Sequence, residues 1–260
     1  MIILKALITG ASSGIGKEMS IYLSDLGYDL ILVARRKEKL EDTKKLCKTN
    51  VDIIELDLSI EKNVYKLYEK TKDKNIDILV NNAGFGLFGH FTETDLDTEL
   101  KMIDLNIKCV HILTKLFLRD FVKRDHGHIL NVASSAGFMA GPKLSTYYST
   151  KNYVLKQTLA IYEELRHMDS KVIISALCPG PVDTEFNKVA HGSFNTKSAT
   201  PEYVARYGID QMLKGKLIII PTLKMKIAVF FNKLLPHKLQ LKINYEIQNA
   251  KTKNSQKLHK

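Results

Sequence analysis

Short apolar runs alternate with longer amphipathic stretches along most of the chain. Seven runs have the length of strands, and they occupy residues 2–8, 29–34, 51–56, 76–80, 128–133, 171–177 and 217–220. The stretches between them repeat apolar residues with helical spacing, and strands that alternate with helices form parallel sheets. The pattern therefore predicts an α/β protein in which a doubly wound parallel sheet carries helices on both faces.

The same pattern predicts how the chain is divided. Residues 1–213 read as one large domain, because a chain of 260 residues with 45% hydrophobic content can bury a substantial core. Residues 214–260 hold the last predicted strand and then a basic, apolar and helical C-terminal extension, which either belongs to the same domain or forms a lid or interface. We find no internal repeat or low-complexity linker before this extension that would indicate a second domain.

A glycine-rich loop directly follows the first predicted strand. It reads Gly10-Ala11-Ser12-Ser13-Gly14-Ile15-Gly16, and a helix is predicted to begin near Gly14. Glycines allow a sharp turn, and the free N–H groups and dipole of a helix N-terminus attract negative charge. An ordinary tight turn is the alternative, but the order of strand, loop and helix favours a site for the phosphates of a nucleotide.

Tyr147 and Lys151 lie four residues apart in a segment that reads as a helix through Leu165, so their side chains share one helical face. A phenol with a pKa near ~10 is a poor proton shuttle at neutral pH. An ammonium about 5 Å away would lower that pKa by about two units. Taken alone, this spacing also fits an ordinary amphipathic helix. Ser134 ends the fifth predicted strand, and open parallel sheets bind ligands at such ends.

Several motifs in the same order and spacing give the chain a resemblance to a known family. They are Thr9-Gly10-x-x-x-Gly14-x-Gly16, Asn81-Asn82-Ala83-Gly84, Ser134, and Tyr147 with Lys151. Over residues 1–213 the chain resembles the single-domain short-chain dehydrogenases/reductases. The resemblance implies a Rossmann-type fold and an NADP(H)-dependent oxidoreductase that interconverts a ketone or aldehyde and the corresponding alcohol by hydride transfer.

The resemblance also implies a role for each member of a catalytic group. Tyr147 would be the acid/base, Ser134 would hydrogen-bond the substrate oxygen, and Lys151 would hold the nicotinamide ribose and lower the pKa of the tyrosine. Asn106, in the helical stretch DLNIKCV, matches the position that kinks this helix and maintains a proton relay through a bound water. An exposed asparagine is the alternative for that position.

The residues that end the second predicted strand indicate which cofactor the chain prefers. Ala34 stands where an NAD-dependent relative usually carries an acidic residue, and Arg35 and Arg36 follow at once. Without a carboxylate to repel it, a 2′-phosphate can pair with a guanidinium group, so we expect NADP rather than NAD. The alternative is that both arginines only begin a solvated helix.

Further cofactor contacts are implied by the resemblance. Asp57 would accept a hydrogen bond from the adenine amino group, although capping of the next helix is an equal alternative. The backbone near Val182 would bind the nicotinamide carboxamide, and Thr184 would also contact the cofactor. The whole predicted cofactor site comprises Gly10, Ser12, Ser13, Gly14, Ile15, Gly16, Arg35, Arg36, Asp57, Leu58, Asn82, Ala83, Gly84, Tyr147, Lys151, Pro179, Gly180, Val182 and Thr184.

A substrate pocket is predicted beside this site. Phe85, Phe88, Phe138 and Met139 would wall it, and the polar segment 185–199 would cover it as a lid. The aromatic residues could equally belong to the core. A pocket of this kind suits a small apolar carbonyl compound or alcohol, whose identity the sequence leaves open.

Positive charge is concentrated at one end of the chain. The chain carries +11 at pH 7, and residues 214–260, with eleven lysines and one acid, carry +10 of it. Here residues 222–236 form an apolar run interrupted by lysines, too short to span a bilayer but suited to an anionic membrane interface. Alternatively, the apolar residues close the pocket or form the interface of a homodimer or tetramer. Nucleic acid is not expected, because the tail lacks arginine and has few aromatic residues for base stacking.

The remaining observations concern the compartment and the alternative function. Cys47, Cys109 and Cys178 lie far apart, which fits reduced thiols and neither a disulfide framework nor a metal site. The run 2–8 leads straight into the glycine loop and leaves no room for a targeting peptide, so we expect a cytoplasmic protein, with peripheral membrane contact through its tail as the alternative. The other function is an NADP-binding protein with vestigial activity that is recruited to a membrane or partner through its basic tail.

Overall fold

All seven predicted strands join one parallel sheet in the computed structural model, which describes residues 4–186 and 198–258, the last nine of them as backbone only. The strand order is β3-β2-β1-β4-β5-β6-β7. The strands are β1 (Lys5–Thr9), β2 (Asp29–Ala34), β3 (Val51–Glu55), β4 (Ile78–Asn81), β5 (His128–Val132), β6 (Ile173–Leu177) and β7 (Ile218–Ile219). This is the predicted Rossmann-type arrangement, and it is confirmed.

Helices connect the strands and extend the chain beyond the sheet. Those of the sheet region are α1 (Gly14–Asp25), α2 (Lys37–Lys45), α3 (Glu61–Thr71), α4 (Leu96–Ile103), α5 (Val110–Lys123), α6 (Ser145–His167) and α8 (Pro201–Leu213). A π-helical turn (Asp104–Cys109) joins α4 to α5, and a 3-10 turn (Ser135–Phe138) follows β5. The extension forms α9 (Leu223–Leu234) and α10 (His237–Leu258).

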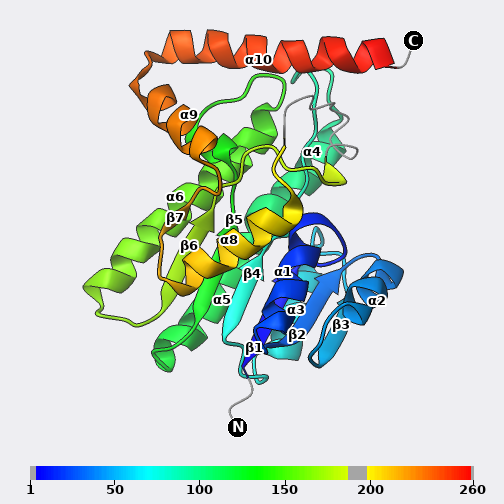
Figure 1. Cartoon of the computed structure of the whole chain (residues 1–260), viewed down its shortest axis with the longest axis vertical. Coiled ribbons are helices and arrows are strands. Elements are labelled where there is room, and N and C mark those ends of the chain that lie inside the picture. Colours follow the sequence, from blue (N-terminus) through cyan, green and yellow to red (C-terminus); the bar gives the residue numbers. More distant parts are fainter. Residues whose placement is uncertain (1–3, 187–197, 259–260) are drawn as a thin grey trace.

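Successive residues of each strand enter opposite cores, because strand side chains alternate between the two faces of a sheet. Ala6 and Ile8 pack with residues of α1 and α8, which lie side by side on one face (Figure 1). Leu7 packs on the other face with residues of α3 and α5. Burial on both faces explains why the strand runs are continuously apolar, as parallel sheets require.

The order in which strands are added to the sheet reverses at β1, although all the strands stay parallel. The strands β2 and β3 lie on one side of β1, whereas β4 and the later strands lie on the other. Loops that leave the carboxyl ends of two such strands diverge, and a crevice opens between them. The glycine loop after β1 and the segment Asn82–Gly84 after β4 border this crevice.

The helices of the extension differ from the others in position. After β7 the chain enters α9 and then α10, which lies across the end of the molecule where the strands terminate (Figure 1). Contacts from α10 reach the loop after β5, since Asn244 Nδ2 donates to the carbonyl oxygen of Ala140 at 2.9 Å. No helix within residues 4–186 and 198–258 is long and apolar enough to cross a membrane.

Candidate active site

A cleft of about 390 Å³ opens at the carboxyl ends of the strands. It collects residues from nearly every predicted motif, although these are spread over most of the chain. Of the predicted site residues, it is lined by Gly10, Ser12, Ser13, Gly14, Ile15, Arg35, Arg36, Asp57, Leu58, Asn82, Ala83, Gly84, Ser134, Tyr147, Lys151, Pro179, Gly180, Val182 and Thr184. Gly16 and Asn106 lie beneath this surface, since both are buried and neither lines the cleft.

The glycine loop is shaped by backbone geometry and by close contacts. Gly10 and Gly14 have φ angles of +67° and +54°, which favour glycine. A Cβ on Gly10 would lie 2.9 Å from Ala83 Cα, and one on Gly16 would collide with the Gly10 carbonyl oxygen. No side chain caps α1 at Ser13, so its first N–H groups remain available to an anion.

Ser134, Tyr147 and Lys151 meet on one wall of the cleft. Ser134 follows β5, while Tyr147 and Lys151 lie one turn apart near the start of α6. Ser134 is 9% exposed and Lys151 is 5% exposed. The Tyr147 hydroxyl hydrogen-bonds the Ser134 side chain. The predicted proximity of these three residues is therefore present in the structure.

The expected effect of Lys151 on Tyr147 is absent. Burial raises the pKa of Tyr147 to about 12, opposed by the hydrogen bond with Ser134. Burial also lowers the pKa of Lys151 to about 8. The ammonium of Lys151 donates to the carbonyl oxygen of Val132 at 2.8 Å and lies 6.0 Å from the centre of the tyrosine ring. Because desolvation dominates both groups, the predicted lowering of the tyrosine pKa was wrong for this arrangement.

Asn106 lies in the π-helical turn between α4 and α5, so a distortion of this helix is observed where the resemblance implied one. Its Nδ2 donates to the Phe85 carbonyl oxygen at 2.9 Å and to Thr150 Oγ1 at 3.1 Å, and its Oδ1 accepts from the Phe85 N–H at 3.1 Å. The side chain is fully buried, so the alternative of an exposed asparagine was wrong. Asn106 thus ties the loop after β4 to the helix that carries Tyr147.

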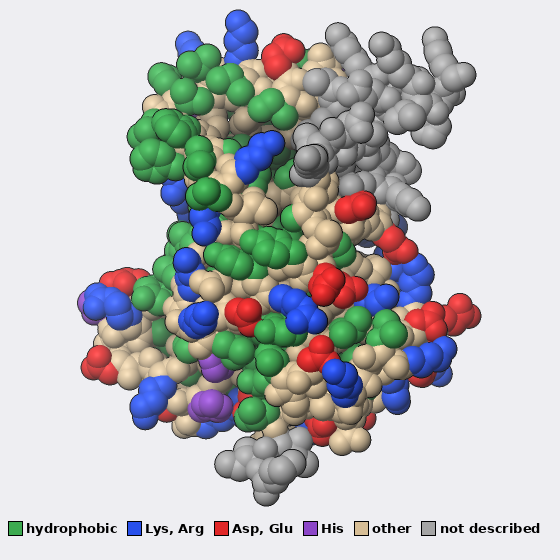
Figure 2. Space-filling view, viewed as in Figure 1, with side chains coloured by type: hydrophobic (Ala, Val, Ile, Leu, Met, Phe, Trp, Pro, Cys, Tyr) green, Lys and Arg blue, Asp and Glu red, His purple; other side chains and the backbone are tan. Residues whose placement is uncertain are grey.

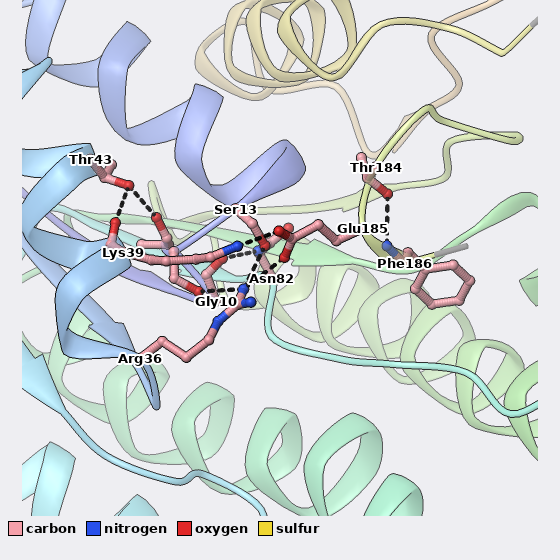
Figure 3. A network of polar contacts seen from close by, with 11 residues as sticks. Gly10, Ser13, Arg36, Lys39, Thr43, Asn82, Thr184, Glu185 and Phe186 are labelled. Atoms are coloured by element: carbon pink, nitrogen blue, oxygen red, sulfur yellow. Dashed lines mark hydrogen bonds and ion pairs between the residues drawn. The ribbon is translucent and has the colours of Figure 1, made fainter. Parts of the chain in front are cut away.

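The two arginines after β2 have different surroundings. Arg35 Nη1 lies 3.8 Å from Asp57 Oδ2, and its side chain is 68% exposed. Arg36 instead points to the glycine loop, with its Nη2 at 3.4 Å from Ser12 Oγ and 3.3 Å from Ser13 Oγ (Figure 3). Both arginines line the cleft.

Asp57 makes a local turn in addition to its contact with Arg35. Its Oδ1 accepts from the Ser59 N–H at 3.0 Å and from Ser59 Oγ at 2.7 Å. The following helix α3 begins at Glu61 with Ile60 as its N-cap residue. Asp57 therefore does not cap that helix, and its carboxylate lies on the wall of the cleft.

The far wall of the cleft comes from the segment after β6. The Pro179 carbonyl oxygen accepts from the Ser135 N–H at 2.8 Å, which fixes this segment beside the end of β5. Thr184 lies against the glycine loop, because a Cβ on Gly14 would be 3.1 Å from its Cγ2. The Phe186 ring packs on that of Tyr147, with centroids 5.3 Å apart.

The predicted pocket walls are only partly correct. Phe85 lines the cleft, but Phe88, Phe138 and Met139 do not. Phe138 instead joins an apolar cluster beneath the end of β5 and β6. Most of the predicted lid, residues 187–197, lies outside the described residues. Glu185 and Phe186, the described start of the predicted lid, do line the cleft. Lining residues that the sequence did not indicate include Leu144, Tyr148 and Gln248.

The described residues 4–186 and 198–258 contain no cluster of His, Cys, Asp and Glu that could hold a metal ion. Burial raises the pKa values of the Cys109 and Cys178 thiols to about 12, as expected for unreactive core residues.

The fold is a Rossmann-type α/β sheet with a cleft at the carboxyl ends of its strands, and comparison with known sequences identifies the family. Residues 4–192 match the short chain dehydrogenase family. An uncharacterized oxidoreductase of Staphylococcus saprophyticus is 35% identical over 185 residues, which cover 69% of this chain and 78% of that protein. The chain therefore belongs to the short-chain dehydrogenase family, and it is an oxidoreductase.

Solved structures agree with this assignment. A short-chain dehydrogenase from Sphingobium yanoikuyae in complex with NADPH is 27% identical with a TM-score of 0.80, over 85% of this chain and 89% of that one. The bulky-bulky ketone specific alcohol dehydrogenase from Comamonas testosteroni is 25% identical with a TM-score of 0.77, over 86% and 88% of the two chains.

Proposed function

We propose that the protein is an NADP(H)-dependent oxidoreductase that interconverts a ketone or aldehyde and the corresponding alcohol. The observation that carries this proposal is the group of Ser134, Tyr147 and Lys151 on one wall of a cleft whose other end holds the glycine loop and two arginines. The relatives from Sphingobium, in complex with NADPH, and from Comamonas, which is ketone specific, support the same chemistry.

The residues present fit a dinucleotide. The open N-terminus of α1 suits a pyrophosphate, and the contacts of Gly10 and Gly14 leave no space for larger side chains at the loop. The segment Asn82–Gly84, together with Asp57 and Leu58, would border the adenosine half of the cofactor, and Pro179, Gly180, Val182 and Thr184 the nicotinamide half. When bound, the cofactor supplies or accepts the hydride.

The chain's own residues handle the proton. Tyr147 donates its phenolic proton to the substrate oxygen in reduction, and Ser134 hydrogen-bonds the same oxygen. Lys151 keeps its positive charge at pH 7, because a pKa of about 8 is above that pH, and we assign its ammonium to the nicotinamide ribose. Asn106 connects the loop after β4 to helix α6 through its hydrogen bonds. We assign to it the role of maintaining the proton relay.

The wall residues indicate the substrate class. Phe85, Leu144, Tyr148 and Phe186 give the substrate side of the cleft an apolar and aromatic surface. A small apolar carbonyl compound or alcohol fits such a surface. NADPH oxidation measured over a panel of ketones and aldehydes tests the proposal, and a vestigial nucleotide-binding protein would bind NADPH without oxidising it in any member of the panel.

The arginines give a prediction about cofactor choice. We expect Arg35→Ala to weaken NADPH binding by about 1 kcal/mol, which is below the range of about 1.5 to 3 kcal/mol for hydrogen bonds to charged groups, because the side chain is largely exposed. NADH binding should be nearly unaffected, because NADH has no 2′-phosphate. Calorimetric dissociation constants measure both, with the exposed Arg119 on α5 replaced by alanine as the control. Equal losses for the two cofactors would show that Arg35 does not contact the 2′-phosphate.

The extension has an unusual distribution of polar residues. The side of α10 that packs against the rest of the protein carries three buried amide side chains, those of Gln240, Asn244 and Gln248. They donate hydrogen bonds to the Asn232 carbonyl oxygen, the Ala140 carbonyl oxygen and the Tyr148 hydroxyl, respectively. Figure 2 shows apolar side chains gathered on the surface over α9 and α10. The exposed large apolar residues of these helices are Leu223, Ile227, Phe230, Phe231, Leu234, Leu239, Leu241, Ile243, Tyr245 and Ile247. Helices of isolated domains normally bury such a face, so an outward apolar surface of this size indicates a partner.

We propose that this apolar surface docks on an anionic lipid surface, with the enzyme otherwise in the cytoplasm. Exposed lysines, among them Lys224, Lys233, Lys238 and Lys242, accompany the apolar residues. A second copy is the competing occupant, and we expect the protein to form a homo-oligomer. Two copies paired through this surface would, however, bring together two segments of +10 each. An anionic surface removes that repulsion and also accepts apolar side chains.

Vesicle sedimentation tests the docking proposal. The protein should sediment with anionic vesicles at low salt and be mostly released at high salt, since salt screens the lysines. A Phe230→Ser/Phe231→Ser variant should lose most of this binding, whereas Phe91→Ser, at an equally exposed position elsewhere, should keep it. Failure of the intact protein to bind at low salt would overturn the proposal. So would a dimer in solution that the double variant abolishes.

A further inference from the structure

One carboxylate bridges two cations at the nucleotide end of the cleft. Glu185 Oε2 accepts from Arg36 Nη2 at 2.9 Å, and Glu185 Oε1 pairs with Lys39 Nζ. The same Arg36 nitrogen is also within hydrogen-bonding distance of the hydroxyls of Ser12 and Ser13 (Figure 3). Two positive groups thus hold a single carboxylate, and two hydroxyl groups lie beside one of the positive groups.

The two cations are positioned by helix α2, independently of Glu185. Arg36 is the N-cap residue of α2 and Lys39 lies in its first turn. The fully buried Thr43 Oγ1 lies 3.1 Å from the carbonyl oxygen of Ala11 and 3.0 Å from that of Lys39, so it fixes helix α2 against the glycine loop. The backbone that carries the two cations is consequently fixed without Glu185, and their side chains can receive another anion when Glu185 leaves.

The charges of this site match a phosphate better than a carboxylate. Arg36 and Lys39 together carry two positive charges, and Glu185 supplies one negative charge. A phosphate monoester carries nearly two negative charges at neutral pH and three acceptor oxygens. Ser12, Ser13, Arg36 and Glu185 all line the cleft, so a ligand in the cleft can reach the site.

Glu185 remains charged at neutral and mildly acidic pH. Its hydrogen bonds with Lys39 and then Arg36 lower the pKa of this carboxyl group to about 2. Lowering the pH toward 5 therefore does not release the two cations. Only a competing anion, or movement of the segment that carries Glu185, can do so.

We propose that Glu185 is an internal competitor for the phosphate monoester of the cofactor. Arg36, Lys39, Ser12 and Ser13 form the phosphate site, and the carboxylate of Glu185 fills it until a ligand phosphate replaces it. The inference rests on the proposed preference for NADP. It assigns to Glu185 a role in cofactor selectivity, because the ion pairs must be broken for a 2′-phosphate to bind and remain intact for a ligand without one.

Titration calorimetry of the whole chain with 2′,5′-ADP and 5′-AMP tests the inference without any turnover. Glu185→Gln should bind 2′,5′-ADP about threefold to tenfold more tightly than the wild type, since two partly exposed ion pairs no longer compete. Its affinity for 5′-AMP should be unchanged. Glu38→Gln removes the same charge from helix α2 outside the cluster and should change neither affinity. The substituted Glu185 is about 40% exposed, so the variant is expected to fold normally.

A second pair of variants tests the site itself. Lys39→Ala should weaken 2′,5′-ADP binding, and adding Glu185→Gln to Lys39→Ala should give a smaller gain than in the wild-type background, because one of the two ion pairs is already lost. An equal gain for both nucleotides, or no gain for either, would overturn the role of Glu185 while leaving the nucleotide site intact. Wild-type protein that does not prefer 2′,5′-ADP over 5′-AMP, or binds neither, would overturn the NADP preference and this inference together.

Discussion

Replacing Tyr147 by phenylalanine is expected to lower turnover by about 10²- to 10⁴-fold, the range that positioned acid/base groups contribute. The change removes only the hydroxyl that meets Ser134. The ring remains, and with it the contact to Phe186. Fold and cofactor affinity should therefore be close to those of the wild type.

Two measurements make this result specific. Calorimetry with NADPH should give a dissociation constant within about twofold of the wild type, a difference below 0.5 kcal/mol. Tyr153→Phe on the same helix removes a hydroxyl that bonds His111 Nδ1 at 2.7 Å, away from the cleft, and should leave turnover unchanged. Near-normal turnover in Tyr147→Phe would remove this residue from the proposed chemistry.

Replacing Lys151 by methionine is expected to abolish most activity and yet stabilise the fold at pH 7. Burial lowers the pKa of Lys151 from 10.5 to about 8, so the charged form is less stable in the folded protein than in the unfolded chain. That difference corresponds to about 3 kcal/mol. Loss of the hydrogen bond to the Val132 carbonyl oxygen offsets about 1 kcal/mol of it. A net gain of about 2 kcal/mol at pH 7 follows.

The pH dependence gives this prediction its sharpest test. Below pH 8 the ammonium is protonated in both states, so the full cost of burying it is present. Between pH 8 and 10.5 the folded protein loses that proton before the unfolded chain does. Because the unfolded chain then binds more protons, the free energy of unfolding of the wild type rises with pH in this window. The advantage of Lys151→Met should therefore shrink across this window. Urea unfolding at pH 7 and pH 9.5 measures it, with the exposed Lys156→Met as the control. An advantage that stays constant with pH would contradict the assignment of this cost to Lys151.

The fold was predictable because every strand and most helices repeat a local pattern. The fifth run, at residues 128–133, and the helix that follows it became β5 and α6 with ends shifted by one or two residues. The last run contributed only the two residues of β7 to the sheet. A short edge strand pairs through only a few residues. The apolar run in the sequence does not show how many of its residues form backbone hydrogen bonds with the neighbouring strand.

The site was predictable where a motif lies at the end of a strand. Ser134, Tyr147 and Lys151 meet because the first turns of α6 pack beside the end of β5. The turn geometry of Gly10 and Gly14 follows from their residue type. The ionisation of Tyr147 and Lys151 was not predictable. Their pKa values depend on how far each group is removed from water, and this is a property of the packed protein.

The ion pair of Glu185 with Arg36 and the orientation of helix α10 could not be predicted from the sequence. Glu185 lies about 150 positions after Arg36 in a segment without periodicity, so nothing local connects the two. The helix α10 buries a stripe of amides at Gln240, Asn244 and Gln248, although amphipathic helices usually bury their apolar side. The sequence pattern of such a helix shows which residues share a side, but it does not show which side packs against the rest of the protein.

We propose that this chain transfers a hydride from NADPH to a carbonyl carbon while Tyr147 supplies the proton. The most direct measurement is reduction of an apolar ketone with NADPH that carries deuterium on the transferred position, followed by mass spectrometry of the product. The wild type is predicted to give an alcohol with one deuterium on the carbinol carbon, and Tyr147→Phe is predicted to give almost none although it binds NADPH. Alcohol without deuterium, or equal labelled product from both proteins, would contradict the account.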